Sequence, residues 1–411
     1  MNELKTELYQ RFVKYASVDT TSDPTQKTTP TTSSQMMFAK MLADEMPSAG
    51  FTDVEMDEYG FVTATIEANT DKPAPTVGFF AHMDTVCDFN GKGITPILHE
   101  NYQGGNVVIN EAKKMYLTPE TSPSLKRCIG HDLVTSDGTS ILAGDDKLGI
   151  SVIMTFAHYL KNHPEVKHGK IRVAFTVDEE TGTGIAYFDV DRFGAEFAYT
   201  IDGGQLGEID YGNFNADKFE IAIQGKNCHP GSAKDFMANP VRIAADIVSS
   251  WPENRLPETT EKEEGFILFM GMDGNLEHAT LRGIVRDHDL TKFENFKKEL
   301  QDIINQKLQK YPNAKITMQF TKQYRNMKDV LEEKPQAMNV LKRALEDAGI
   351  EYNLAQVRGG TDGAQLTFRG LPTPNIFAGY ENPHGPYEWL SLDWTEKVFH
   401  IMKYIVTDLV K

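Results

Sequence analysis

The sequence predicts an α/β fold in which one layered domain is built from both ends of the chain and a smaller α+β domain is inserted between them. Strand-like and helix-like runs alternate over residues 1–213 and again over 324–411, which is typical of α/β layers. Residues 214–323 follow the order βαββαβ instead, which can close as a four-stranded sheet with two helices on one face. The length of 411 residues also favours more than one domain.

The N-terminal segment predicts two helices joined by a loop. Residues 1–18 carry apolar side chains at helical spacing, at Leu4, Leu8, Phe12 and Tyr15. Residues 19–34 are rich in Thr, Ser and Pro and nearly free of apolar side chains, so we expect an exposed loop. A second helix should begin near Ser33 and end at Gly50.

The other elements of the outer domain follow from short apolar runs and from helical periods. We expect strands at residues 52–58, 61–66, 76–80, 171–177, 196–201, 352–356 and 374–377. We expect helices at 145–160, 335–348 and 393–409, with a short helix after Gly360. In the inserted domain the expected strands are 218–224, 265–272, 279–286 and 315–324, and the expected helices are 240–251 and 291–310.

Composition and charge exclude several classes of protein. No run approaches the roughly 18 consecutive apolar residues of a membrane helix, and charges interrupt residues 1–17, unlike a signal peptide. Three widely spaced cysteines argue against a disulfide framework and fit a reducing compartment. A net charge of −17 repels phosphate backbones. We therefore expect a cytoplasmic protein with neither nucleic acid nor membrane as a partner.

A histidine and an aspartate follow the apolar strand expected at residues 76–80. Residues two apart in extended backbone point to the same side, so Asp84 can reach a ring nitrogen of His82. A carboxylate in this position commonly fixes a metal-binding histidine in one tautomer. A strand-end histidine capped by a nearby acid is the alternative interpretation.

Acidic residues also lie at the ends of other apolar runs. Asp145 and Asp146 open a predicted helix, where they can simply cap the helix and complement its dipole. Asp178, Glu179 and Glu180 follow a predicted strand. Such a cluster usually marks a solvated turn, but one acid at a strand end can bind a metal while the next acts on a water.

The combined pattern predicts a metal centre. Asp202 closes a further strand before two glycines, and His384 lies in a turn-rich segment, where a histidine is more often a surface residue. Acids or histidines end four predicted strands, and open α/β sheets place their sites at the carboxyl ends of strands. Two histidines with several carboxylates suit zinc, cobalt or manganese.

Motifs of other common chemistries are missing. The sequence has no H-E-x-x-H, no G-x-S-x-G and no G-x-x-x-x-G-K-[ST]. A G-x-G-x-x-G pattern begins at Gly182 but has Tyr187 in place of its third glycine.

Over nearly its whole length, the sequence resembles the M20 metallopeptidase family, and within it the members that act on tripeptides. The order of the inserted domain carries the resemblance, together with the strings His82-Met-Asp84-Thr85, Gly144-Asp-Asp-Lys147, Asp178-Glu-Glu180, Ile201-Asp-Gly-Gly204, His229-Pro-Gly231, Arg286-Asp287 and Arg358-Gly-Gly-Thr-Asp-Gly363. The resemblance implies a zinc-peptidase domain, with a mixed sheet flanked by helices, and an inserted ferredoxin-like α+β domain that acts as lid and dimerisation domain.

The resemblance implies two zinc ions per subunit, with Co²⁺ or Mn²⁺ as substitutes. His82 and Asp202 would hold one ion, Glu180 and His384 would hold the other, and Asp145 would bridge both.

Further residues receive roles from the same resemblance. Asp84 would position His82, Glu179 would be the general base on a water between the two ions, and a cis peptide would join Asp145 to Asp146. His229 would reach from the inserted domain into the partner subunit's active site and stabilise the negative charge of the tetrahedral intermediate.

Two arginines are candidates for substrate binding. The resemblance implies that Arg286 binds the peptide's C-terminal carboxylate. From the residues alone, a salt bridge with Asp287 or Asp289 is equally consistent. Arg358, which precedes two glycines, is a candidate for a similar part.

The implied activity is hydrolysis of the first peptide bond of tripeptides by a homodimer, in the final breakdown of peptides. A dipeptidase or N-acyl amino acid deacylase of the same fold stays open, because the metal ligands catalyse the same amide chemistry. A non-catalytic peptide-binding scaffold is the alternative of another class, and the retention of Glu179 argues against it.

Overall fold

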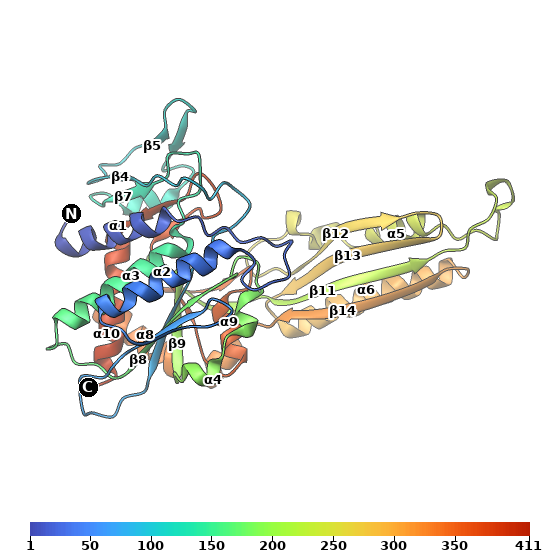
Figure 1. Ribbon diagram of the computed structural model, residues 1–411. Coiled ribbons are helices and arrows are strands. Elements are labelled where there is room, and N and C mark those ends of the chain that lie inside the picture. Colours follow the sequence, from blue (N-terminus) through green and yellow to red (C-terminus); the bar gives the residue numbers. More distant parts are fainter. The chain divides into compact units, whose positions relative to one another are not determined.

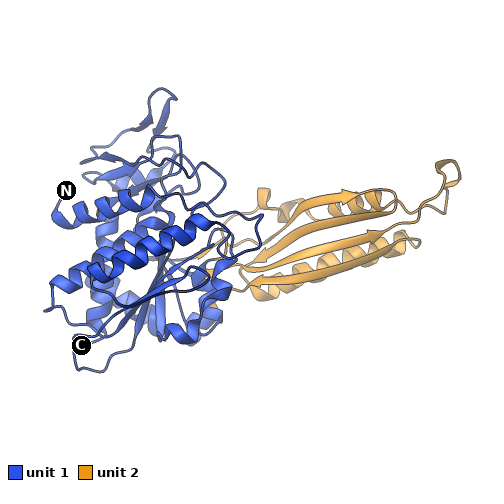
Figure 2. Cartoon of the chain, viewed as in Figure 1, with its two compact units in different colours: residues 1–211, 329–355, 361–411 blue, residues 212–328, 356–360 orange.

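The computed structural model describes residues 1–411, which divide into two compact units (Figure 2). Unit 1 comprises residues 1–211, 329–355 and 361–411, and unit 2 comprises 212–328 and 356–360. Relative to the insertion expected at 214–323, unit 2 begins two residues earlier and ends five residues later. It also takes a short segment from the returning chain.

Unit 1 is centred on a mixed eight-stranded sheet with the order β1-β2-β8-β3-β9-β16-β10-β15; β8 and β9 of this sheet are labelled in Figure 1. β3 pairs in parallel with β8 and β9, and β16 pairs in parallel with β9, whereas β2 is antiparallel to β8. The strands are β1 (Thr52–Met56), β2 (Val62–Ile66), β3 (Val77–His82), β8 (Ile171–Thr176), β9 (Phe197–Gly203), β10 (Glu208–Asn213), β15 (Asn353–Val357) and β16 (Asn375–Phe377).

Helices flank this sheet, which confirms the predicted fold class. They are α1 (Glu3–Ala16), α2 (Ser33–Ala49), α3 (Gly144–Asn162), α4 (Val190–Phe193), α7 (Lys328–Glu333), α8 (Gln336–Asp347), α9 (Asp362–Phe368) and α10 (Leu392–Asp408). The sequence did not predict α4, α7 or the strand β10, which are short or lie at the edge of the insertion.

The alternation of β3 shows how the layers form. Successive side chains of a strand point to opposite faces. Phe79 packs against Phe156 of α3, whereas Phe80 packs against Phe193 of α4. Because both faces of β3 are covered, all six of its residues are buried, and the strand that carries His82 is held in the middle of the unit.

Local chemistry sets the helix ends. The Asn2 side chain accepts the Lys5 N–H at 2.8 Å and begins α1, and Gly50, at φ 107°, ends α2 as the sequence predicts. In α3 the backbone of Asp145 and Asp146 is not helical and the peptide bond between them is cis, so the regular helix begins after Asp146.

Short strands that the sequence did not predict complete unit 1. They form a four-stranded sheet in the order β17-β18-β7-β4 and a two-stranded sheet. The strands are β4 (Ile97–His99), β7 (Leu133–Thr135), β17 (Tyr380–Glu381) and β18 (Trp389–Ser391), and the pair β5 (Val107–Asn110) and β6 (Met115–Leu117). Trp389 and Trp394 lie in the core beneath them.

The segment at residues 19–34 differs from the exposed loop that the sequence predicts. Thr20 is 0% exposed and donates from Oγ1 to the carbonyl of Met83 at 2.7 Å. Thr31 donates from Oγ1 to the carboxylate of Asp178 at 2.6 Å. The polar side chains of residues 19–34 therefore hold the loops that follow β3 and β8, instead of being exposed only to solvent.

Unit 2 is a four-stranded antiparallel sheet, β12-β13-β11-β14, with both helices packed into one core. In chain order its elements are β11 (Asn215–Gln224), α5 (Pro240–Val248), β12 (Phe266–Gly274), β13 (His278–Asp287), α6 (Leu290–Lys310) and β14 (Lys315–Tyr324). This is the ferredoxin-like βαββαβ order that the sequence predicts. No helix of the chain is both long and apolar enough to cross a bilayer.

Candidate metal centre

The five predicted metal ligands lie together in unit 1. His82, Asp145 and Asp202 form a first ligand cluster, and Asp145, Glu180 and His384 form a second. Within each cluster the candidate ligand atoms all lie within 4.8 Å of one another. Asp145 belongs to both clusters, as a bridging ligand must.

The distances show how Asp145 is shared. Its Oδ1 lies 2.8 Å from Nε2 of His82, and its Oδ2 lies 3.1 Å from Nε2 of His384. The same ring nitrogen of His82 is 3.5 Å from Asp202 Oδ1, and that of His384 is 3.2 Å from Glu180 Oε2. Each carboxylate oxygen of Asp145 therefore faces a different cluster.

Asp84 holds the chain around both clusters. It is 0% exposed, and its two carboxylate oxygens accept the N–H groups of Glu179 and Glu180 at 3.0 and 3.2 Å. Nδ1 of His82 lies 3.1 Å from the carbonyl of Asp84 and 3.4 Å from its carboxylate. Asp84 therefore fixes the turn that carries two acids of the site as well as the ring of His82.

The turn after β8 that carries Glu179 and Glu180 is held by Asp178. The residue before them, Asp178, has φ 54°, a left-handed conformation that non-glycine residues adopt rarely. Its carboxylate accepts the Thr31 hydroxyl and the Nε2–H of Gln35, the latter at 2.7 Å. These buried bonds hold the turn in place.

The site contains more carboxylates than its two histidines can neutralise. Burial and the carboxylate of Asp145 raise the pKa of Glu180 to about 7. Hydrogen bonds to Asp145 and Glu180 raise the pKa of His384 to about 11. Burial, and then Asp202, raises the pKa of Glu179 well above its usual range. Such an excess of negative charge favours cations, and a divalent metal competes with protons for these groups.

A further observation indicates that these donor atoms fit a divalent metal. Oε1 of Glu180 is buried and has no hydrogen-bond partner, although buried carboxylate oxygens normally have one. A cation at the second cluster would satisfy this oxygen. Histidine nitrogen and carboxylate oxygen are ligands that zinc, cobalt and manganese accept.

Comparison with known proteins identifies the family. A model described as the peptidase dimerisation domain of M20 proteins matches residues 211–312. Peptidase T of Geobacillus thermodenitrificans is 46% identical over 403 residues, 98% of each chain. The chain belongs to the peptidase T family. Peptidase T of Shouchella clausii is 45% identical over 399 residues, 97% of each chain.

Solved structures show the same fold as this member of the peptidase T family. Aminopeptidase PepT from Bacillus cereus has a TM-score of 0.76 at 23% identity and 99% coverage of both chains. A tripeptidase from Staphylococcus aureus has a TM-score of 0.76 at 19% identity, over 99% of this chain and 98% of that one. A dinuclear metal binding peptidase of the M20 family from Bacillus subtilis has a TM-score of 0.67 at 14% identity, with coverage of 99% and 98%.

The remaining predicted site residues lie in unit 2. Arg286 donates to the carbonyl of Val285 at 3.1 Å, and its guanidinium lies 5.2 Å from the centre of the Tyr324 ring. Arg358 donates Nη1 to the carbonyls of residues 262 and 264 and Nη2 to the hydroxyl of residue 260. His229 is exposed and accepts the N–H of Gly231 at 3.1 Å.

Two residues of the segment that carries His384, which sequence reasoning did not find, contact the candidate metal ligands. The hydroxyl of Tyr380 donates to Asp202, and the carboxylate of Glu388 accepts the N–H of Asp145. The available signal was their spacing, since both lie four residues from His384, one on each side.

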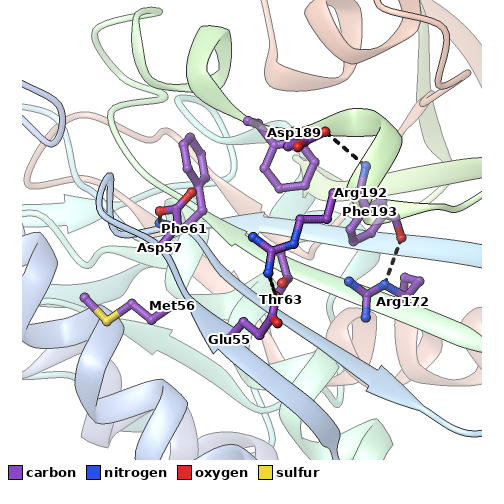
Figure 3. A pocket seen from close by; sticks show the side chains of 10 residues that line it. Glu55, Met56, Asp57, Phe61, Thr63, Arg172, Asp189, Arg192 and Phe193 are labelled. Carbon is purple, nitrogen blue, oxygen red and sulfur yellow. Dashed lines mark hydrogen bonds and ion pairs between the residues drawn. The ribbon is translucent and has the colours of Figure 1, made fainter.

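A separate pocket of about 300 Å³ lies on unit 1 (Figure 3). Its charged residues include Arg172 at the beginning of β8, whereas the candidate ligand Glu180 follows the end of that strand. Arg192 pairs with Glu55 at 2.6 Å, and Arg172 donates to the carbonyl of Phe193 at 2.9 Å. Because these cations already have partners within the pocket and it contains no candidate ligand, it does not belong to the metal centre.

Proposed function

We propose that the chain is a metal-dependent aminopeptidase that removes the N-terminal residue from tripeptides. The observation that carries the proposal is the pair of ligand clusters sharing Asp145 in a member of the peptidase T family. Structural relatives that are an aminopeptidase and a tripeptidase support the same activity.

The ligand roles follow from the two clusters. His82 and Asp202 would hold one ion, Glu180 and His384 would hold the other, and Asp145 would serve both. Zinc is our proposed metal, because this donor set suits it. When bound, the two ions supply Lewis-acid polarisation of the scissile carbonyl and a water of lowered pKa.

Glu179 is the proposed general base. Its carboxylate accepts the proton of the attacking water and delivers it to the leaving amine. Support comes from its place between Asp84, which holds its N–H, and the ligand Glu180. Glu179→Gln should lower kcat by about 10²–10⁴-fold while both metal ions stay bound. A loss of metal equal to the loss of turnover would contradict the role.

Arg286 is the proposed anchor for the substrate carboxylate. A guanidinium forms paired hydrogen bonds with a carboxylate, and Arg286 is held by one backbone carbonyl and by the side chain of Tyr324. Arg358 is the lesser candidate because three of its contacts already hold the 260–264 loop. Arg286→Lys should raise KM for Ala-Ala-Ala and leave the weaker cleavage of Ala-Ala-Ala-amide unchanged; equal effects on both peptides would contradict this assignment.

We further propose a cytoplasmic homodimer that forms through unit 2, with His229 stabilising negative charge in the partner subunit's active site. The family match at residues 211–312 supports the dimer. Light scattering should give twice the mass of 46.1 kDa. Mixing His229→Ala with Glu179→Gln should restore part of the activity, because one site of the mixed dimer then has both residues; no recovery would contradict the trans role.

A peptide panel tests the activity directly. The panel is Ala-Ala, Ala-Ala-Ala, Ala-Ala-Ala-Ala, N-acetyl-Ala and Ala-Ala-Ala-amide, each assayed with added Zn²⁺ and with chelator. We expect chelator-sensitive cleavage of the free tripeptide above all others. Preference for the dipeptide or the N-acyl compound would assign the same centre to a different substrate class.

A further inference from the structure

The segment between β17 and β18 touches the metal centre at three points. Its turn carries His384, whose side chain is 43% exposed and whose φ is 68°. On either side lie Tyr380 and Glu388, which are 4% and 1% exposed. We propose that Tyr380 and Glu388 are positioning residues of the metal centre, which set the places of Asp202 and Asp145 relative to His384. This inference rests on the proposed two-metal function.

Glu388 holds the backbone that presents Asp145. Its Oε2 accepts the N–H groups of Leu142 and Ala143 at 2.7 and 3.0 Å, and its Oε1 accepts that of Asp145 at 3.1 Å. Ala143 has φ 63°, so the chain turns sharply here. A buried carboxylate is tolerated where it is well hydrogen-bonded, and these bonds tie the turn before α3 to the segment that carries His384.

Tyr380 holds the other end of the first cluster. Its hydroxyl lies 3.1 Å from Oδ1 of Asp202 and 2.9 Å from the carbonyl of the same residue. Oδ1 is also the oxygen that faces His82. The hydroxyl therefore orients the carboxylate oxygen that would meet a metal.

The pairing of β17 with β18 links the contacts of Tyr380 to those of Glu388. Tyr380 pairs with Leu390, and Glu381 pairs with Trp389. Leu390 and Trp389 are fully buried. An exposed histidine on a turn is poorly fixed by its own surroundings, but here its two flanks are hydrogen-bonded to two other ligands. Partners that orient metal ligands commonly contribute 10–100-fold in metal affinity.

The two positioning residues should act on different binding steps. Glu388 acts on Asp145, which belongs to both clusters, so Glu388→Gln should weaken both Zn²⁺-binding steps by about 10–100-fold. Tyr380 acts on Asp202 alone, so Tyr380→Phe should weaken only the step at the first cluster, by about 10-fold. A His384→Ala variant, which removes a ligand of the second cluster alone, assigns the two steps.

The experiment is Zn²⁺ titration of the full chain after removal of metal by a chelator. Bound zinc is measured by elemental analysis and affinity by competition with a chromophoric chelator. The matched control is Glu381→Gln, an acid of the same segment that accepts from Ser124 at 2.5 Å and contacts no ligand. It should bind zinc as the wild type does, whereas Glu388→Asp should recover part of the affinity that Glu388→Gln loses.

Each outcome decides the question. If wild type binds no zinc, the proposed two-metal function is wrong, and the inference that rests on it is wrong as well. If wild type binds two ions and Tyr380→Phe and Glu388→Gln bind them as tightly, or if Glu381→Gln weakens binding equally, the positioning roles are wrong. Where Glu388→Gln does not fold, the Tyr380→Phe and Glu388→Asp titrations decide in the same way.

Discussion

Replacing Asp84 by Asn tests whether one buried carboxylate organises both ligand clusters. In the wild type its two oxygens accept the N–H groups of Glu179 and Glu180. An Asn side chain offers only one oxygen, so whichever way the amide turns, one of these N–H groups faces an NH₂ group. The other N–H keeps an acceptor that has lost its charge.

The cost can be estimated from these contacts. A buried N–H without an acceptor costs about 1–3 kcal/mol, and replacing a charged acceptor by a neutral one costs about 1 kcal/mol more. Unfolding of the metal-free variant should therefore require about 2–4 kcal/mol less. Metal affinity should also fall, about 10–100-fold, because the ring of His82 loses its charged partner. With metal in excess, that loss destabilises by a further ~1.4–2.7 kcal/mol.

The assay is urea unfolding of metal-free and zinc-loaded protein, followed by tryptophan fluorescence; Trp389 and Trp394, two of the three tryptophans, lie in the core of unit 1. Asp88→Asn, an exposed aspartate of the same segment, is the control and should change neither curve. Unchanged stability of metal-free Asp84→Asn would refute the backbone role. An equal loss in both forms would refute the action on metal binding.

Three further perturbations have defined outcomes. Thr31→Val removes the hydroxyl bound to Asp178, so it should lower the free energy of unfolding by about 1–2 kcal/mol and reduce kcat. The control is Thr32→Val, whose hydroxyl does not contact Asp178 and which should have a smaller effect. Equal effects of the two substitutions would contradict the reasoning. A hydrogen bond from Lys310 lowers the pKa of Asp246 to about 2, from 3.8. This stabilisation of unit 2 is present above about pH 4 and is lost as pH falls towards 2. The stability of Asp246→Asn should therefore depend less on pH in that range. An Asp246→Asn variant with the same pH profile as the wild type would refute the role of Asp246. Chelator should abolish cleavage and lower the Tm, since a ligand at about 1,000 times its Kd contributes ~4 kcal/mol; recovery with Zn²⁺ is expected, and activity that survives chelation would contradict a metal mechanism.

Regular elements were the part of the fold that the sequence predicted well. The strand expected at residues 171–177 is β8 (Ile171–Thr176), and Gly50 ends α2 as expected. Such elements are encoded locally, by periodic burial and by end signals. Three-residue strands such as β4 and β7 carry no period of their own and form only because a partner strand lies beside them.

In the candidate site, too, residues with a local sequence signal could be predicted, and residues defined by distant partners could not. The five proposed ligands could be found because each acid or histidine lies beside a strand end or in a turn-rich segment and because the whole set resembles a known family. Glu388 was not found, because its spacing of four residues from His384 is a weak signal by itself, an acid before a buried strand is ordinary in sequence, and its partners are backbone N–H groups. Thr20 was placed in an exposed loop for a similar reason, since its burial depends on the carbonyl of Met83.

The strand order has a consequence for synthesis on the ribosome. β16, formed by residues 375–377, lies inside the sheet between β9 and β10, so the sheet of unit 1 has a gap until these residues emerge. Unit 2 is nearly continuous in sequence and can fold during translation, as compact domains commonly do. His384 and Glu388 arrive later still. The nascent chain therefore lacks one of its proposed metal ligands until residue 384 has been added, and we expect no peptidase activity before that point.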